Sequence, residues 1–319
     1  MRLRRCLAAA ALALAAVAAA AQGYPPVKAR LQPVRVTDRV WYVQGDPGVA
    51  SAANEGFNSN AGFIVTDEGV VVIDALGTPS LGHALLEAIR SVTPKPVRRV
   101  IVTHYHADHF YGLKPFKDAG AEVWAHHGAL DYLTNGEAER RRAQRSRDLF
   151  PWVDAGTALV RADRWLEGDA SFTLGGVRFE VQHFGPAHSP EDLVVVLPQE
   201  GVVFSGDILF TGRIPFVGEA DSKAWLARIG RLIDLRPRLM VTGHGEVSRD
   251  PGKDLALTRD YLTFLRAEMG KAVADFVPFE EAYRRTDWSR YSSLPAFEAA
   301  NRVNAYGTYL LLERESLGK

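Results

Sequence analysis

Two kinds of hydrophobic pattern divide the chain into a β-rich beginning and a longer part in which helices and strands alternate. Over residues 32–77, short β-branched and aromatic runs are separated by polar turns, which predicts strands. The clearest pair, residues 60–65 and 70–74, flanks residues 66–69 and predicts a β-hairpin. Residues 44–59 are rich in Gly, Ala, Asn and Ser, and we interpret them as an active-site lip or as a mobile surface loop.

Beyond Asp74, apolar residues recur alternately at helical and at strand spacing, which predicts the α/β class. We expect strands over residues 100–103, 122–125, 171–174, 177–183, 193–197, 201–205 and 239–242. We expect helices over residues 80–92, 110–120, 131–148 and 222–235. From Pro251 the pattern predicts a helical extension rich in aromatic residues, which could cover the core domain, wall a site or carry a dimer contact.

The first 21 residues predict a secretory signal peptide. Arg2, Arg4 and Arg5 precede a long Ala/Leu/Val run that ends in small residues near Ala21, as in peptides that are cleaved during export. The Arg4-Arg5 pair suggests a twin-arginine signal, although the residues after it match poorly. We therefore expect a periplasmic protein without stable membrane insertion, with units at residues 1–21, 32–250 and 251–319.

Removal of the expected signal peptide would change both the cysteine content and the net charge of the chain. The only cysteine, Cys6, would leave with the peptide, which excludes disulfides and thiolate ligands from the mature chain. The formal charge would fall from 0 to about −3, because three arginines and no acidic residue are removed. This charge argues against nucleic acid as a partner and leaves a small-molecule substrate, with the oligomeric state open.

Four potential metal ligands lie within six residues at a predicted strand-to-helix junction: His104, His106, Asp108 and His109. The first two are two residues apart, so on an extended segment both point to one face. Asp108 and His109 suit the turn into the next helix. Imidazole and carboxylate together suit zinc, iron or manganese, and a strand end is where ligands bind in α/β proteins, which favours a metal site over a run of surface histidines.

Three further ligand-type residues, His188, Asp207 and His244, each follow a predicted strand and lie beside Gly or Pro. Asp74 also ends a strand, where it could anchor the metal loop or cap the following turn. Other polar residues favour ordinary roles. His126 and His127 could reach a substrate but are better interpreted as structural or solvated, and the run 140–142 of arginines as a solvated face.

The segment Thr103-His104-Tyr105-His106-Ala107-Asp108-His109, with His188, Asp207 and His244 in Thr242-Gly243-His244-Gly245, resembles the metallo-β-lactamase-fold hydrolases. The resemblance implies a four-layer αββα sandwich over residues 32–250, followed by the C-terminal helical extension. It also implies that His104, His106 and His188 hold one metal ion and that Asp108, His109 and His244 hold the other. Asp207 would bridge two Zn²⁺ ions, with iron or manganese as other choices.

An aspartate at position 207, where many zinc β-lactamases have cysteine, is similar to the thioesterase, lactonase and nuclease branches. Residues 53–62 and 74–79 resemble periplasmic zinc hydrolases associated with sulfur-oxidation and quinoprotein systems. The implied function is an exported dinuclear zinc hydrolase that uses a metal-bridging hydroxide to cleave an ester, thioester, lactone or lactam. Asp108 would steer the water and pass a proton to the leaving group.

Other functions remain open. A true β-lactamase fits the same ligands, and a persulfide dioxygenase of this fold would need one iron, held by His106, His188 and Asp207. A non-catalytic periplasmic carrier of a metal or ligand is the third alternative. Residues near the ligands in sequence could line an apolar mouth with one cationic anchor, or pack in the core: Tyr105, Phe110, Tyr111 and the segment 213–216.

Overall fold

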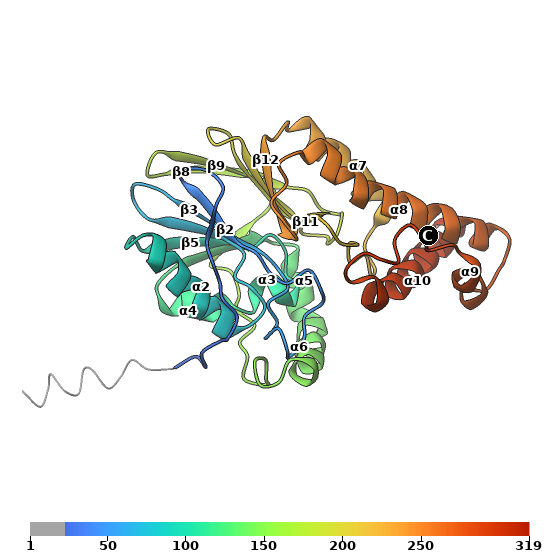
Figure 1. Cartoon of the computed structure of the whole chain (residues 1–319), viewed down its shortest axis with the longest axis horizontal. Helices are drawn as coiled ribbons and strands as arrows, with labels where there is room; N and C mark the ends of the chain where they lie inside the picture. Colours follow the sequence, from blue (N-terminus) through green and yellow to red (C-terminus); the bar gives the residue numbers. More distant parts are fainter. Residues whose placement is uncertain (1–22, 319) are drawn as a thin grey trace, which may run out of the picture.

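The computed structural model describes residues 23–318, so the expected signal peptide at residues 1–21 lies outside the described residues. Two mixed sheets form the centre of the molecule (Figure 1). The seven-stranded sheet has the order β1 (Val34–Arg35), β2 (Val40–Val43), β3 (Ala61–Val65), β4 (Val70–Ile73), β5 (Val97–Ile101), β6 (Glu122–His126) and β7 (Arg164–Leu166). The five-stranded sheet has the order β12 (Leu239–His244), β11 (Val202–Phe210), β10 (Leu193–Leu197), β9 (Val177–His183) and β8 (Ala170–Leu174).

The central strands of both sheets are buried on two faces, whereas the strands β1 and β8 are partly exposed. Along the buried strands, successive side chains alternate between two different cores. In β4 all four residues are buried; Val70 and Val72 face the helices, whereas Val71 and Ile73 face the other sheet. The same alternation occurs in β12, where Met240 faces the helices and Val241 faces the other sheet. A continuous apolar run is what a strand buried on both faces requires.

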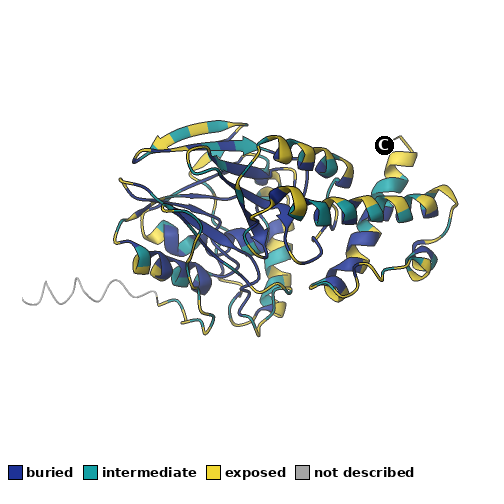
Figure 2. Cartoon of the chain, turned by 45° about the horizontal axis from the view of Figure 1, so that its top comes forward, coloured by how far each residue is buried: buried dark blue, intermediate teal, exposed yellow. Residues whose placement is uncertain are grey.

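Helices cover the outer face of each sheet, which completes the four αββα layers expected from the sequence (Figure 1). On the first sheet lie α2 (Pro79–Val92), α3 (Ala107–Phe110), α4 (Leu113–Asp118) and α5 (Ala129–Thr134), and α6 (Glu137–Asp148) packs against α5. On the second lie α7 (Ser222–Asp234) and the long α8 (Pro251–Ala274). Figure 2 shows the consequence: both sheets are mostly dark blue, while the helices expose their outer faces.

The C-terminal extension is helical, as expected. After α8 come α9 (Phe279–Arg285) and α10 (Phe297–Ser316), which project to one side of the sandwich (Figure 1). The buried face of α8 repeats at helical spacing through Leu255, Leu262 and Leu265. These side chains share one core with α7 and the second sheet, so the extension packs on the sandwich. Within residues 23–318, no helix combines the length and apolarity that a bilayer crossing requires.

Several elements differ from the sequence predictions. The helix expected over residues 110–120 is divided into α3, which ends at Phe110, and α4, which begins at Leu113. The helix expected over residues 131–148 is two helices, α5 and α6, because Gly136 adopts a left-handed conformation with φ of 85° between them. The strand expected to end at residue 205 continues to Phe210 through a bulge at Gly206, where φ is 50°. The three-residue strand β7 was not predicted, because its sequence is too short and polar to show a strand pattern.

Candidate metal centre

Strand ends and loops of both sheets carry the seven ligand-type residues to one edge of the sandwich. His104 and His106 follow β5, while Asp108 and His109 lie in the short helix α3. His188 lies in the loop between β9 and β10. The last two come from the parallel pair β11 and β12: Asp207 lies directly after the bulge, and His244 is the final residue of its strand.

These residues form two adjacent groups, each able to hold a metal ion: His104, His106, His188 and Asp207, and then Asp108, His109 and His244. Within each group the candidate ligand atoms all lie within 4.8 Å of one another. In the first group His188 Nε2 is 2.8 Å from His106 Nδ1 and 3.3 Å from Asp207 Oδ2. His106 and Asp108 are half-buried, while the other five are buried, so the centre opens on the side of these two residues.

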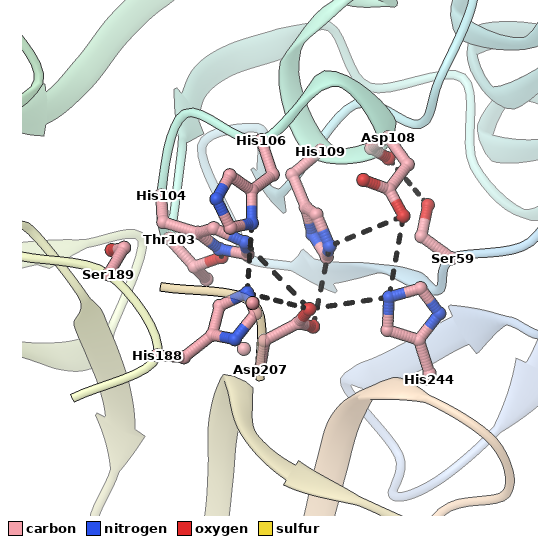
Figure 3. A network of polar contacts seen from close by, with 12 residues as sticks. Ser59, Thr103, His104, His106, Asp108, His109, His188, Ser189, Asp207 and His244 are labelled. Carbon is pink, nitrogen blue, oxygen red and sulfur yellow. Dashed lines mark hydrogen bonds and ion pairs between the residues drawn. The ribbon is translucent and has the colours of Figure 1, made fainter. Parts of the chain in front are cut away.

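The carboxylate of Asp207 lies between the two groups (Figure 3). Its Oδ2 is 3.4 Å from His244 Nε2, and its Oδ1 is 3.4 Å from His109 Nε2. His244 Nε2 is also 3.4 Å from Asp108 Oδ2. One carboxylate therefore adjoins nitrogens of both groups, which is the position a bridging ligand needs.

Hydrogen bonds on the far ring nitrogens fix how three imidazoles are turned. Nδ1 of His109 lies 2.9 Å from Asp74 Oδ2, and Nδ1 of His104 lies 3.0 Å from Thr103 Oγ1. Nδ1 of His244 lies 2.7 Å from the Asn58 carbonyl oxygen. In each case Nε2 is left to face the centre, and such outer contacts set the tautomer of a ligand histidine.

Several buried polar atoms of the centre have no hydrogen-bond partner within residues 23–318: His104 Nε2, His109 Nε2, His188 Nδ1 and Asp207 Oδ1. Buried nitrogens and carboxylate oxygens are rarely left unpaired in a native protein. Those at His104, His109 and Asp207 face the two groups, and imidazole with carboxylate suits zinc or iron. The donor set therefore fits metal ions.

Charges and burial prepare most of the imidazoles for metal binding. Burial lowers the pKa of His106 to about 3 and the pKa of His188 to about 4, so both rings are neutral at pH 7. Burial also disfavours a charged His109, yet Asp207, Asp74 and Asp108 raise its pKa well above the usual value. A metal ion bound by His109 would release that proton.

Two glycines make room for the Asp207 carboxylate. A Cβ atom at Gly243 would lie 1.9 Å from Asp207 Oδ1, so no larger residue fits there without moving the carboxylate. Gly206 has φ of 50°, and a Cβ atom on it would lie 2.9 Å from the side chain of Thr103. The close approach of β11, β12 and the loop after β5 thus depends on glycine at both positions.

The lip, residues 44–59, contributes contacts that the sequence did not specify. Asn58 donates from Nδ2 to Asp108 Oδ2 at 3.0 Å, and Ser59 Oγ donates to the Asp108 carbonyl oxygen at 2.5 Å. The following Asn60 donates to the carbonyl oxygens of Thr242 and Gly245. The lip is therefore joined to the second group of metal ligands, Asp108, His109 and His244. The small polar residues of the lip were the only sequence feature that pointed to these contacts. Such residues are equally common in loops that have no functional site.

Other candidates lie outside the two groups. His126 is buried and stacks on His183, while His127 is exposed beside Glu167, in line with structural or solvated roles. In the arginine run, Arg140 is exposed but Arg141 and Arg142 are half-buried, so the run is only partly solvated.

Of the two roles left open for the aromatic residues near the ligands, an apolar mouth or packing in the core, the structure supports packing. Tyr105, Phe110 and Tyr111 are buried in the core beneath the first sheet, because their strand exit and helix turn them inward. From the segment 213–216, Arg213 lies against His244, with Nη1 3.4 Å from its Nδ1, and Phe216 is 37% exposed.

The chain is similar in sequence to known metal-dependent hydrolases of this class. The chain is 22% identical over 238 residues to the linear primary-alkylsulfatase of Pseudomonas sp. (strain ATCC 19151), which covers 64% of this chain and 45% of the relative. It is 26% identical over 195 residues to the metallo-beta-lactamase type 2 of Elizabethkingia meningoseptica, covering 60% of this chain and 70% of that one. This chain thus spans less than half of the alkylsulfatase.

Solved structures share the fold. The stereoselective inverting sec-alkylsulfatase Pisa1 from Pseudomonas sp. matches 90% of this chain and 50% of its own, with a TM-score of 0.67 and 23% identity. The metallo-beta-lactamase from Pontibacter korlensis matches 73% of this chain and 99% of its own, with a TM-score of 0.56 and 22% identity. The model of the metallo-beta-lactamase superfamily matches residues 54–244, a segment that contains all seven ligand-type residues. The chain therefore belongs to the metallo-beta-lactamase superfamily and carries two adjacent His/Asp clusters able to bind metal ions.

Proposed function

We propose that this protein is an exported dinuclear zinc hydrolase that cleaves an ester, thioester, lactone or lactam. The observation that carries the proposal is the pairing of two buried ligand groups about the carboxylate of Asp207. His104, His106 and His188 would hold one ion, Asp108, His109 and His244 the other, and Asp207 would contact both. A pair of divalent ions so held would lower the pKa of a shared water and polarise the bond to be cleaved.

Asp108 is the proposed proton-transfer residue. Burial alone would raise the pKa of this carboxyl, but His109 and His244 hold it below the usual value, so the group is ionised. Asn58 fixes its Oδ2 with a 3.0 Å hydrogen bond. The half-buried carboxylate is therefore oriented to accept a proton from the attacking water and to return it to the leaving group.

The two groups also bear on the alternatives. A mononuclear iron enzyme needs only the first group, and it gives no reason for Asp108, His109 and His244 to lie within 4.8 Å of one another. A non-catalytic carrier would not need the hydrogen bond from Asn58 that orients the half-buried carboxylate of Asp108. A true β-lactamase uses the same centre, so it differs from the proposal only in the bond that is cleaved.

Elemental analysis of the purified protein tests the metal centre, and a hydrolysis screen on the same sample tests the reaction. We expect two zinc ions per chain and turnover of a simple ester, thioester, lactone or lactam. Alkyl sulfates belong in the screen, because two relatives are alkylsulfatases. One iron per chain with oxygen uptake on a persulfide would establish the dioxygenase instead. Turnover of nitrocefin, and of no other substrate in the screen, would narrow the hydrolase to a β-lactamase.

The proposed export has its own test. The basic start and apolar run of residues 1–21 support a periplasmic location. Expression of the full chain, cell fractionation and N-terminal sequencing of the mature protein should place it in the periplasm, beginning near Gln22. Recovery in the cytoplasm with the first residues intact would contradict export without affecting the proposed reaction.

A further inference from the structure

Glu55 is a buried glutamate of the lip that bonds to the backbone of a segment distant in the sequence. The residue is 5% exposed. Its Oε1 and Oε2 accept hydrogen bonds from the Lys28 amide at 3.0 and 2.8 Å, and Oε2 also accepts one from the Ala29 amide at 2.9 Å. Among residues 23–318 the carboxylate has no other hydrogen-bond donor and forms no ion pair. Because a buried carboxylate is stable only with such partners, this contact attaches residues 28 and 29 to the lip.

The backbone at Glu55 is strained as well. Its φ of 58° lies in the left-handed region, which is unfavourable for a residue with a side chain and is the usual place of a glycine. Gly56, the next residue, also has a positive φ, of 76°. A glycine at position 55 would relieve the strain but would remove the carboxylate. The side chain of Glu55 therefore offsets the backbone cost through its contact with residues 28 and 29.

The segment that supplies the two amides, residues 24–31, is called the strap below. At its beginning, the Tyr24 ring stacks on His83 of α2 with 5.5 Å between the ring centroids, and the Tyr24 hydroxyl donates to Asp118 Oδ2 at 2.8 Å. Three alternate residues of the strap pack against the core of the first sheet: Val27, Ala29 and Leu31. The strap is therefore fastened to the first sheet and its helices by contacts that do not involve Glu55.

An open cleft lies between the strap and the lip beside this contact. Its volume is about 510 Å³, and all of its lining residues belong to the two segments: residues 28–30, 44–46, 53–55 and Phe57. Side chains do not fill the space there, so packing contributes little to holding the strap and the lip together along the cleft. The hydrogen bonds of Glu55 are therefore important for this attachment.

Three residues beyond Glu55, the lip reaches the second group of metal ligands. Asn58 donates to Asp108 Oδ2 at 3.0 Å, and its carbonyl oxygen lies 2.7 Å from His244 Nδ1. Ser59 Oγ donates to the Asp108 carbonyl oxygen. Among the hydrogen bonds of residues 23–318, none joins the lip to the first group. A displacement of the lip would therefore disturb Asp108 and His244 and leave the ligands of the first ion in place.

We propose that Glu55 is a positioning residue of the metal centre: it fastens the lip to the strap, and the lip in turn orients Asp108 and His244 for the second metal ion. The segment 24–31 thereby takes part in building the site. This inference rests on the dinuclear centre of the proposed function. It adds a residue outside the ligand set whose effect is confined to one of the two ions.

Zinc affinity tests this role separately at each ion. Stepwise removal of zinc from the loaded protein by a fluorescent chelator gives one Kd for each ion. Glu55→Gln keeps the size of the side chain but loses its charge and one acceptor. We expect this variant to raise the Kd of the second ion about 10-fold, as for loss of charge-assisted hydrogen bonds, and to leave that of the first ion unchanged. Glu68→Gln, at an exposed glutamate between β3 and β4, should bind both ions like the parent. An unchanged second Kd, or an equal rise in both, would overturn the proposal.

The strap offers a second variant, which leaves the lip sequence unchanged. Lys28→Pro removes the amide that donates to both oxygens of Glu55, and we expect the same selective rise in the Kd of the second ion. Lys28→Ala keeps the amide and is the matched control, which should bind zinc like the parent. Because both changes break one contact, the double variant Glu55→Gln/Lys28→Pro should lose much less than the sum of the two single losses. Additive losses would show that the two residues act independently and would contradict the proposal.

Hydrogen exchange measures the attachment itself and requires no turnover. The amides of Gly56 and Phe57 bond to carbonyl oxygens within the lip. At saturating zinc we expect them to exchange about 10-fold faster in Glu55→Gln than in the parent, while the amides of β4 keep their rate. If this pattern and the zinc loss hold but the parent cleaves no substrate, the hydrolase proposal fails and the positioning role stands. If the lip exchanges equally in both proteins, or β4 also exchanges faster, Glu55 does not hold the lip specifically and the proposal fails.

Discussion

Asp74 accepts a hydrogen bond from Nδ1 of His109 at 2.9 Å, and this contact ties the end of β4 to the metal centre. The same carboxylate accepts bonds from the Thr103 amide at 2.7 Å and the Thr103 hydroxyl at 2.8 Å. Asp74 holds a left-handed backbone with φ of 62°, an arrangement that costs about 1–3 kcal/mol in a non-glycine residue. Of the two roles expected from the sequence, anchoring fits, because the cap of α2 is Thr78.

We predict that Asp74→Asn weakens zinc binding by about 10- to 100-fold, the usual effect of removing an outer partner of a ligand histidine. The amide accepts on one oxygen only, so it cannot accept the bonds from His109, the Thr103 hydroxyl and the Thr103 amide together. Competition against a fluorescent zinc chelator measures the affinity. Asp67→Asn, which changes an exposed carboxylate paired with Arg39, should bind zinc like the parent. Equal affinities in all three proteins would show that Asp74 serves the fold alone.

Local sequence was sufficient where a pattern is repeated within a few residues. The apolar run before His104 and the spacing of the following ligands predicted the strand exit. The resemblance to the metallo-β-lactamase fold implied that all seven residues hold one pair of ions, and the structure places the seven at one edge of the sandwich. Contacts between segments that are distant in the sequence could not be predicted from local patterns. The bond from Asn58 to Asp108 joins residues 50 apart, and no local pattern selects one polar lip residue over its neighbours.

The bulge in β11 shows a second limit. Ser205, Gly206 and Asp207 have the composition of a strand end followed by a turn, yet the strand continues because β12 pairs with it on both sides of Gly206. Pairing with another strand decides whether a glycine is a turn or a bulge, and that information is absent from the local sequence. Asp207 was thus predicted as a ligand, but not within a strand.

We predict that Asp207→Ala lowers the metal content from two ions to one or fewer per chain. Its two carboxylate oxygens adjoin His109, His188 and His244. The alanine variant lacks both oxygens and therefore lacks the one side chain that contacts both groups of ligands. Elemental analysis after dialysis against dilute zinc measures the effect. Retention of two ions per chain would exclude a bridging role for Asp207.

Gly243→Ala should reproduce much of this loss without altering any ligand. The added methyl group would lie 1.9 Å from Asp207 Oδ1 and 3.0 Å from the Gly206 backbone, so the carboxylate has to move. We expect reduced zinc content together with lower stability in urea. Gly230→Ala in α7 is the matched control. Nothing lies within 4 Å of its Cβ position, and a helical Gly→Ala change should stabilise the protein by about 0.5–1 kcal/mol. Full zinc content in the Gly243→Ala variant would contradict the predicted displacement.

Outside the metal centre, His126 should make stability depend on pH. Burial, with His183 and His127 nearby, lowers its pKa to about 4, against about 6.5 in the unfolded chain. Between these values the unfolded state takes up the proton and the folded state does not, so stability falls as the pH drops from 6.5 to 4. His126→Gln carries no such proton, and its urea-unfolding free energy should therefore decline less than that of the parent between pH 7 and pH 5. His83→Gln, a change at an exposed side chain on α2, should follow the parent. Parallel curves for all three proteins would assign the acid sensitivity to other groups.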